Sequence, residues 1–202
     1  MGRIFAAFAI FLLPAALAGS SLRDGGAAVL TPRQAEEFFR RAGEEMVPDG
    51  AAFDLCADGV PLHIACSGGK FFLTLGGKTI TIDGTENPLR PVDETLALAP
   101  FDLLCPFFRW QEVYYEGPGN ALGRAVQRFS AISPTGWTVR VGLDAKYHCP
   151  LCWDLNGPGG KLLRRFRLRS IIRGDDGEWG MGRAQIFIPE EERTLTIVPI
   201  RP

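Results

Sequence analysis

Two cysteine-containing motifs carry the residue types best suited to metal or thiol chemistry. Cys149 and Cys152 form a C-x-x-C motif, while His63 and Cys66 stand three residues apart. Together they would make a Cys3His ligand set, which suits zinc. A zinc knuckle must curl tightly, however, and Trp153 follows the second cysteine where a glycine would ease the turn. A small zinc or thiol protein is therefore the less favoured alternative, and we expect no metal or other cofactor.

The cysteine count also limits thiol chemistry. A redox dithiol needs its first cysteine at a helix N-terminus, which lowers the thiol pKa, and the sequence around Cys149 is typical of a strand. Five cysteines is an odd number, so at least one thiol stays free or pairs between chains. Cys105, which lies in a strongly apolar segment, is the candidate for a buried free thiol.

Catalytic signatures are missing from the sequence. It contains two histidines and no G-x-S-x-G nucleophile elbow. The run Gly77-Lys78-Thr79 imitates the end of a phosphate-binding loop, but Phe72 stands where that loop needs a glycine. Carboxylates are scattered without the spacing of paired acids, for example Asp54, Asp58, Asp102 and Glu112. We therefore expect a protein that is not an enzyme.

The N-terminus predicts export. Residues 1–18 consist of Arg3, a short apolar run and an A-x-A site, so we expect a signal peptide cleaved after Ala18 and one domain over residues 19–202. The apolar run of about ten residues is too short to span a bilayer, and no later segment is long enough. A net charge of −1 argues against nucleic acid as a partner. The expected location is the bacterial periplasm.

One amphipathic helix is expected at the start of the mature chain. Thr31 and Gln34 can form a capping box, and Pro32 suits the first helical position. Apolar residues then recur at helical spacing on one face, namely Ala35, Phe38, Phe39, Ala42 and Met46. The run 48–50 ends the helix. Its apolar face either docks on a core or borders a ligand cavity through Phe38 and Phe39.

The rest of the chain is predicted to be mainly antiparallel sheet. Gly76-Gly77 between residues 70–75 and 78–83 is a strong hairpin signal, and counting back from it pairs Leu73 with Ile80 and Phe71 with Ile82. Residues 52–57 and 60–66 form a second hairpin candidate. Further strands are expected at 110–116, 123–132, 137–143, 147–155, 161–173, 178–188 and 193–200, separated by turns at 117–120, 134–136, 156–160 and 174–177. The total is about eleven strands in a sandwich or barrel.

An apolar segment over residues 96–108 interrupts the two groups of strands. It carries one charge, Asp102, and Pro100 and Pro106 divide it into short helical pieces. A segment that is apolar all round must be covered on every side. It is either a plug in the core or a lid over an apolar cavity.

The run 161–173 is strongly basic. In a strand, one face would carry Leu162, Arg164, Phe166, Leu168, Ser170 and Ile172. The other face would carry Lys161, Leu163, Arg165, Arg167, Arg169, Ile171 and Arg173. A solvated outer face is the preferred interpretation. A surface for an anionic headgroup or an acidic partner is the alternative.

These patterns resemble the outer-membrane lipoprotein-sorting protein family, whose members share the fold of the LolA/LolB-like lipoprotein carriers. The resemblance covers residues 95–190 well and residues 30–90 by order of elements. It rests on residues 123–132 and 139–171, with Asp144 closing a strand, Tyr147 after it, the D-x-x-G run 154–157, the G-K-L-L run 160–163, the pair Gly177 and Trp179, and the apolar run 100–108 before Trp110.

The resemblance implies an incomplete β-barrel closed by an N-terminal helix and a short helical lid, whose interior holds acyl chains of lipids or lipoproteins. On this basis we expect the cavity to be formed by nine apolar residues: Phe38, Phe71, Leu73, Ile80, Ile82, Phe101, Leu104, Phe107 and Phe108. The alternative is an envelope interaction or sensor protein with the same fold, which binds a protein partner and has no lipid cargo.

Overall fold

The computed structural model describes residues 27–46, 50–67, 70–82, 88–93, 96–173 and 179–200; the predicted signal peptide lies outside them. Eleven antiparallel strands form one sheet in the order β4-β3-β2-β1-β11-β10-β9-β8-β7-β6-β5. The strands are β1 (Ala52–Ala57), β2 (Val60–Ser67), β3 (Lys70–Leu75), β4 (Lys78–Ile82), β5 (Glu112–Ala121), β6 (Arg124–Ile132), β7 (Thr138–Asp144), β8 (Pro150–Asn156), β9 (Leu162–Arg173), β10 (Trp179–Ile188) and β11 (Arg193–Pro199).

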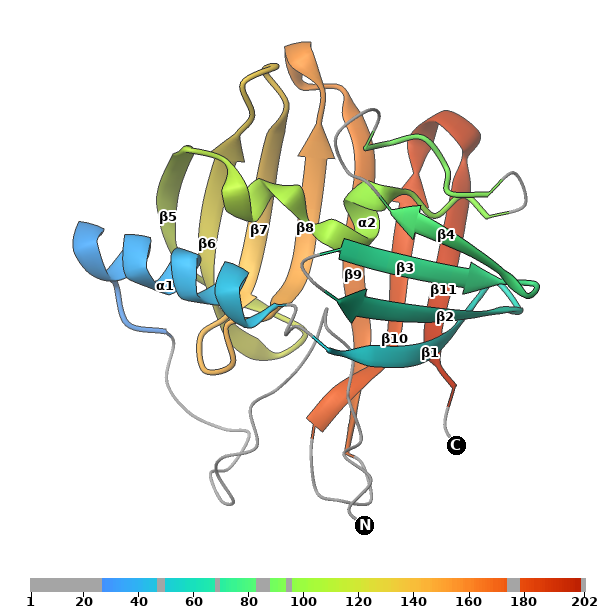
Figure 1. Cartoon of the computed structure of the whole chain (residues 1–202). Helices are drawn as coiled ribbons and strands as arrows, with labels where there is room; N and C mark the ends of the chain where they lie inside the picture. The colour runs from blue at the N-terminus through green and yellow to red at the C-terminus, as the bar shows by residue number, and fades with distance from the viewer. Residues whose placement is uncertain are drawn as a thin grey trace.

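This sheet is two meanders joined edge to edge. Strands β1–β4 and β5–β11 each pair in sequence order, and β1 pairs with β11 through Leu55 opposite Pro199. The sheet curls around its inner face without closing, because β4 and β5 are its two edges (Figure 1). The expected mainly antiparallel open barrel with an N-terminal helix is confirmed.

The glycine hairpin has the predicted register. Leu73 lies opposite Ile80 and Phe71 opposite Ile82. The turn residues Gly76 and Gly77 both have positive φ, which the tight connection requires. Local turn chemistry and alternation therefore determine the geometry of β3 and β4.

The predicted turn over residues 117–120 is wrong. β5 continues through these residues to Ala121 and turns at Leu122, which has positive φ. A register shift between Tyr115 and Gly117 marks a bulge in the pairing with β6. Pro118 is tolerated because β5 is an edge strand, where a missing N–H donor breaks no further pairing.

β8 begins later than predicted because a tight loop precedes it. The Asp144 carboxylate accepts hydrogen bonds from the backbone N–H groups of Lys146 at 2.9 Å and Tyr147 at 3.0 Å. His148 then has a positive φ of 59°. These turn conformations exclude residues 147–149 from the strand, which starts at Pro150.

The helix α1 (Pro32–Glu45) forms with the predicted cap. The Thr31 hydroxyl accepts from Gln34 N–H at 3.4 Å, and the Gln34 side chain accepts from Thr31 N–H at 3.0 Å. The buried residues of the helix are Ala35, Phe39 and Ala42. The helix lies across the open side of the curled sheet (Figure 1).

The apolar segment folds as two short helices inside the curled sheet. These are α2 (Pro100–Leu104) and the 3-10 helix η1 (Pro106–Arg109), with left-handed Cys105 between them. Residues 96–103 are buried, so this part of the segment fills the core inside the curled sheet, whereas η1 packs against α1 through Phe108 and Phe39. The other 3-10 turns are η2 (Pro158–Gly160) and η3 (Pro189–Glu191).

The predicted alternation of the basic strand changes phase at a bulge. From Arg164 to Leu168, even-numbered residues of β9 face the core, whereas Ile171 packs against the core beyond the bulge and Ile172 does not. At the start of the strand, next to a register shift in the pairing with β8, Leu163 packs against the core in place of the predicted Leu162. The register to β10 shifts between Met181 and Arg183 and again at Ala184. The expected positions of Ile171 and Ile172 are therefore exchanged.

None of the helices in the described part of the chain has the length and apolar character needed to cross a membrane.

Candidate lipid-binding cavity

A cavity of about 910 Å³ opens between α1, η1 and the β5 edge of the sheet. This volume is near the upper end of the usual range for small-molecule sites, which runs from about 300 to 1,000 Å³. Its lining includes apolar residues from seven elements and the connections between them: Ala35, Phe39, Met46, Cys66, Phe71, Leu104, Cys105, Phe108, Val113 and Phe129. The apolar stripe of α1 and the inner face of the sheet both contribute to these walls.

Aromatic rings form the wall beneath α1. The Phe39 ring lies 5.1 Å from the Phe108 ring and 5.1 Å from the Phe129 ring, measured between centroids. Gly43 lets the helix approach η1, since a Cβ atom at this position would lie 3.0 Å from Phe108 Cβ. The absence of a side chain at Gly43 therefore sets the distance between α1 and η1.

The rim of the cavity is polar and nearly neutral in charge. Glu36, Arg40 and Glu44 of α1 contribute to the lining, and Arg40 forms an ion pair with Glu44 at 2.5 Å. Arg109 contributes from η1. Across the opening, Tyr114 is 55% exposed and presents an aromatic ring to solvent. A ligand with an apolar body and a polar head would match this division between wall and rim.

A hydrogen-bond chain holds the segment that leads into α1. The Tyr115 hydroxyl donates to Gln127 Oε1 at 2.6 Å and accepts from Leu30 N–H at 3.2 Å. Gln127 Nε2 donates to the Ala28 carbonyl at 2.8 Å. Because Gln127 is buried, these bonds satisfy an otherwise costly amide and position the entrance to the helix.

The other end of α1 is fixed to the β7–β8 loop. His148 Nδ1 lies 3.0 Å from Glu45 Oε2, and Arg41 Nε lies 2.5 Å from Glu45 Oε1. Burial opposes ionisation of Glu45, but the hydrogen bonds from Arg41 and His148 outweigh it and lower the Glu45 pKa. The ring of Phe38 packs edge-on against His148, with centroids 4.6 Å apart.

The apolar segment is anchored by one buried ion pair. Arg164 Nη1 of β9 lies 2.8 Å from Asp102 Oδ2 of α2, and Arg164 also donates to the Ala97 carbonyl at 3.2 Å. Asp102 Oδ2 accepts from Ala99 N–H at 2.8 Å. Burial raises the pKa of Asp102 to about 6, although Arg164 and the Ala99 N–H both act to lower it.

The nine predicted cavity residues divide into two groups. Phe71, Leu104 and Phe108 line the cavity. The remaining six do not line it: Phe38, Leu73, Ile80, Ile82, Phe101 and Phe107. Phe101 and Phe107 instead pack with Trp153 in the core, at ring distances of 5.5 and 6.4 Å. We had expected both residues to lie in a lid over the cavity. Both rings are instead fully buried, because the strands enclose the apolar segment at these two positions.

Several lining residues were not predicted. Met46 belongs to the helical stripe recognised in the sequence, so periodicity could have identified it. Phe39 lines the cavity, as the open alternative for this helix had it, whereas Phe38 does not. Tyr115 and Phe129 lie on neighbouring strands β5 and β6 with rings 5.3 Å apart. Nothing local distinguishes these two from other inward-facing strand residues.

The residues of the alternative zinc site are not brought together by the fold. His63 and Cys66 lie three positions apart in β2, and an odd separation places them on opposite sides of the sheet. His63 Nδ1 lies 2.8 Å from Asp54 Oδ1 on the outer face, and Cys66 is buried. Within the described ranges, no three His, Cys, Asp or Glu side chains group in a way that could hold a metal ion.

Comparison by sequence finds no protein-family model and no curated protein that matches the chain. Comparison of structures finds a DUF1329 family protein from Desulfovibrio piger, with a TM-score of 0.57 and 9% identity over 82% of this chain and 90% of that one. A LolA superfamily protein from Nitrosomonas europaea matches with a TM-score of 0.56 and 11% identity over 83% and 94% of the two chains.

A third structure is a domain described as an outer membrane lipoprotein-sorting protein, from Vibrio parahaemolyticus. Its TM-score is 0.52 at 16% identity, over 71% of this chain and 64% of that one. At these identities the matches establish the fold, and the expected resemblance is confirmed at that level. The chain has the LolA-like open-barrel fold of these structures, with a cavity between its helix and its sheet.

Proposed function

We propose that the chain is a non-enzymatic carrier of the bacterial periplasm, which holds the acyl chains of a lipid or lipoprotein in the cavity between α1, η1 and β5. Export by a signal peptide at residues 1–18 is part of this proposal. Outer-membrane lipoprotein sorting is the process that it would serve, by analogy with the lipoprotein-sorting domain of similar fold.

The observation that carries the proposal is the apolar wall of the cavity. A volume of about 910 Å³ is equivalent to about 30 water molecules at their share of liquid volume. A methylene group has a similar size, so one long acyl chain fits with room to spare. Each buried methylene contributes about 0.8 kcal/mol, so about ten of them provide strong binding without covalent chemistry.

The same observation separates this proposal from the alternative of an interaction protein without lipid cargo. That alternative predicts a filled interior, because a sensor uses its apolar residues only as a core. A large cavity bordered by Phe39, Phe108 and Phe129 supports cargo binding, since an apolar ligand would remove this apolar wall from water.

Binding of cis-parinaric acid, a fluorescent acyl probe, tests the proposal. Ala35→Trp adds a large ring on the cavity side of α1, and we expect it to weaken probe binding at least about tenfold. Glu37→Trp places the same ring on the exposed side of the helix and is the matched control, with unchanged binding.

A second variant protects the test against misfolding of Ala35→Trp. Leu104→Asp introduces a charge at a half-buried lining position, and we expect the same loss of probe binding with an unchanged circular dichroism spectrum. Binding equal to wild type in both folded variants would reject the cavity as the acyl site.

A further inference from the structure

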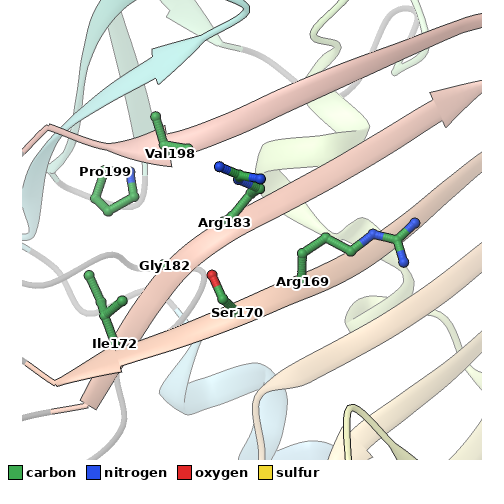
Figure 2. Close-up of a pocket in the computed structure, with 7 residues that line it drawn as sticks. All are labelled: Arg169, Ser170, Ile172, Gly182, Arg183, Val198 and Pro199. Atoms are coloured by element: carbon green, nitrogen blue, oxygen red, sulfur yellow. The ribbon is translucent and has the colours of Figure 1, made fainter.

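A second hollow lies on the outer face of the sheet, opposite the inner face against which α1 and α2 lie. It has a volume of about 250 Å³ and is lined by seven residues of β9, β10 and β11: Arg169, Ser170, Ile172, Gly182, Arg183, Val198 and Pro199. Figure 2 shows Ser170 between Ile172 and the two arginines, with Val198 and Pro199 on the neighbouring strand. None of these residues belongs to the proposed acyl cavity.

The bulge between β9 and β10 creates this hollow. In a regular strand Arg169 and Ser170 would face opposite sides, but the change of phase turns both outward and leaves both exposed. On β10, Gly182 and Arg183 lie between the buried residues Met181 and Ala184 in the same way. Two neighbouring pairs of residues therefore face solvent at one place.

Gly182 keeps the hollow open. A Cβ atom at this position would lie 2.6 Å from Ser170 Oγ and 2.7 Å from Ile172 Cγ2. Both distances are far inside van der Waals contact, so any side chain here would displace Ser170 or Ile172. The glycine thus leaves the Ser170 hydroxyl accessible next to Arg183.

Within the described ranges, no carboxylate neutralises the charge of the hollow. Farther along β9, Arg165 and Arg167 share Asp154, at 3.1 and 2.7 Å. Arg169 and Arg183 pair with no carboxylate among the residues whose placement is described. Arg169 Nε instead donates to the neutral Gln185 Oε1 at 2.7 Å.

We propose that this hollow binds a phosphate ester, with the phosphoryl group held by Arg169, Arg183 and the Ser170 hydroxyl. Guanidinium groups donate paired hydrogen bonds to phosphate oxygens, and a serine hydroxyl adds a further donor. Ile172, Val198 and Pro199 form an apolar wall for the organic part of the ester. The ester is either a soluble molecule or a lipid headgroup, since both present the same chemistry.

Two binding measurements distinguish these sources. In the first, glycerol 3-phosphate is added to the protein, and shifts of the Ser170, Gly182 and Arg183 amide resonances are followed by NMR. In the second, the protein is sedimented with phosphatidylcholine vesicles that contain or lack phosphatidic acid. Shifts in the first measurement identify a soluble ester, and sedimentation only with phosphatidic acid identifies a headgroup.

Three variants decide whether the hollow itself is responsible. Arg183→Gln and Gly182→Ala should each weaken the observed binding at least about tenfold, since the first removes a charged donor and the second fills the space. Arg140→Gln removes an exposed arginine of the outer face that lies outside the hollow and should leave binding unchanged.

The proposal is overturned if neither probe binds, or if Arg140→Gln weakens binding as much as Arg183→Gln does. The second result would indicate general attraction to a basic face. Because none of the three positions lines the acyl cavity, cis-parinaric acid binding should be unchanged in all three variants, and failure here is distinguishable from failure of the carrier proposal.

Discussion

Arg164 on β9 and Asp102 on α2 form an ion pair inside the core, with 2.8 Å between Nη1 and Oδ2 and with side chains that are 4% and 0% exposed. The two residues lie 62 positions apart in the sequence. Arg164 also donates to the Ala97 carbonyl, so one side chain holds both the start of the apolar segment and the helix that follows. The second carboxylate oxygen, Asp102 Oδ1, accepts no hydrogen bond from any described residue.

Replacement of Arg164 should strongly destabilise the protein. Arg164→Met leaves Asp102 buried without its partner, and such losses cost about 3–5 kcal/mol. Arg165→Met is the matched control, because Arg165 pairs with Asp154 on the half-exposed outer face, where an ion pair contributes at most about 1 kcal/mol. Urea denaturation of both variants measures the difference; equal losses would contradict a special role for the buried pair.

The raised pKa of Asp102 predicts a pH dependence of stability. The folded state binds this proton more tightly than the unfolded chain does, since the pKa is about 6 in the fold against 3.8 unperturbed. The free energy of unfolding should therefore rise by up to about 3 kcal/mol from this group as pH falls from about 7 to about 4.

The non-titrating variant Asp102→Asn is the reference for that measurement. Other groups titrate in both proteins, so the difference between wild type and Asp102→Asn isolates the carboxyl group. A difference that is constant with pH, or that changes with the opposite sign, would show that the Asp102 pKa is not raised.

Close packing of α1 against η1 predicts a penalty for a larger residue at position 43. Gly43→Val places two methyl groups where even a Cβ atom would lie 3.0 Å from Phe108, and overpacking of this kind costs about 1–3 kcal/mol. Thermal or urea denaturation measures this cost. Gly180→Val on β10 is the control, because a Cβ atom there meets no atom within 4 Å; equal loss in both would argue against the contact.

Two cysteines should be unreactive while the protein is folded. Burial raises the pKa of Cys149 to about 12 and also raises the pKa of Cys105, so neither forms a thiolate near neutral pH. Peptide mapping after treatment with iodoacetamide should find both unmodified in native protein and modified after unfolding in guanidinium. Rapid native labelling of Cys149 would show that its surroundings open to solvent.

Local sequence patterns predicted the helices and strands better than the contacts between them. The register of Leu73 with Ile80 follows from a two-residue turn and alternation, both of which are local. Residues 117–120 were predicted to be a turn, because Pro118 is compatible with a strand only at the edge of a sheet. The order of the strands, which the sequence does not give, is what places β5 at an edge. Alternation placed Arg164 with the core residues of its strand, but its partner depends on α2 lying over β9, which no short-range pattern encodes.

The cavity was predictable in part for a similar reason. Apolar periodicity shows which residues are buried when the chain folds. It does not show which of them line the cavity, so Phe71, Leu104 and Phe108 were predicted together with six residues that pack elsewhere. A cavity forms where two apolar faces do not come into contact. Its position depends on small residues such as Gly43 and on the curl of the whole sheet. Those are properties of the assembled fold.

The most direct test of the carrier proposal is native mass spectrometry of the protein after export to a bacterial periplasm and purification without detergent. The intact mass is compared with the mass after denaturation. We expect an excess of several hundred daltons or more that is lost on denaturation and is extracted into organic solvent. A native mass equal to the denatured mass, in protein that also fails to bind cis-parinaric acid, would contradict the proposal that the cavity holds acyl chains.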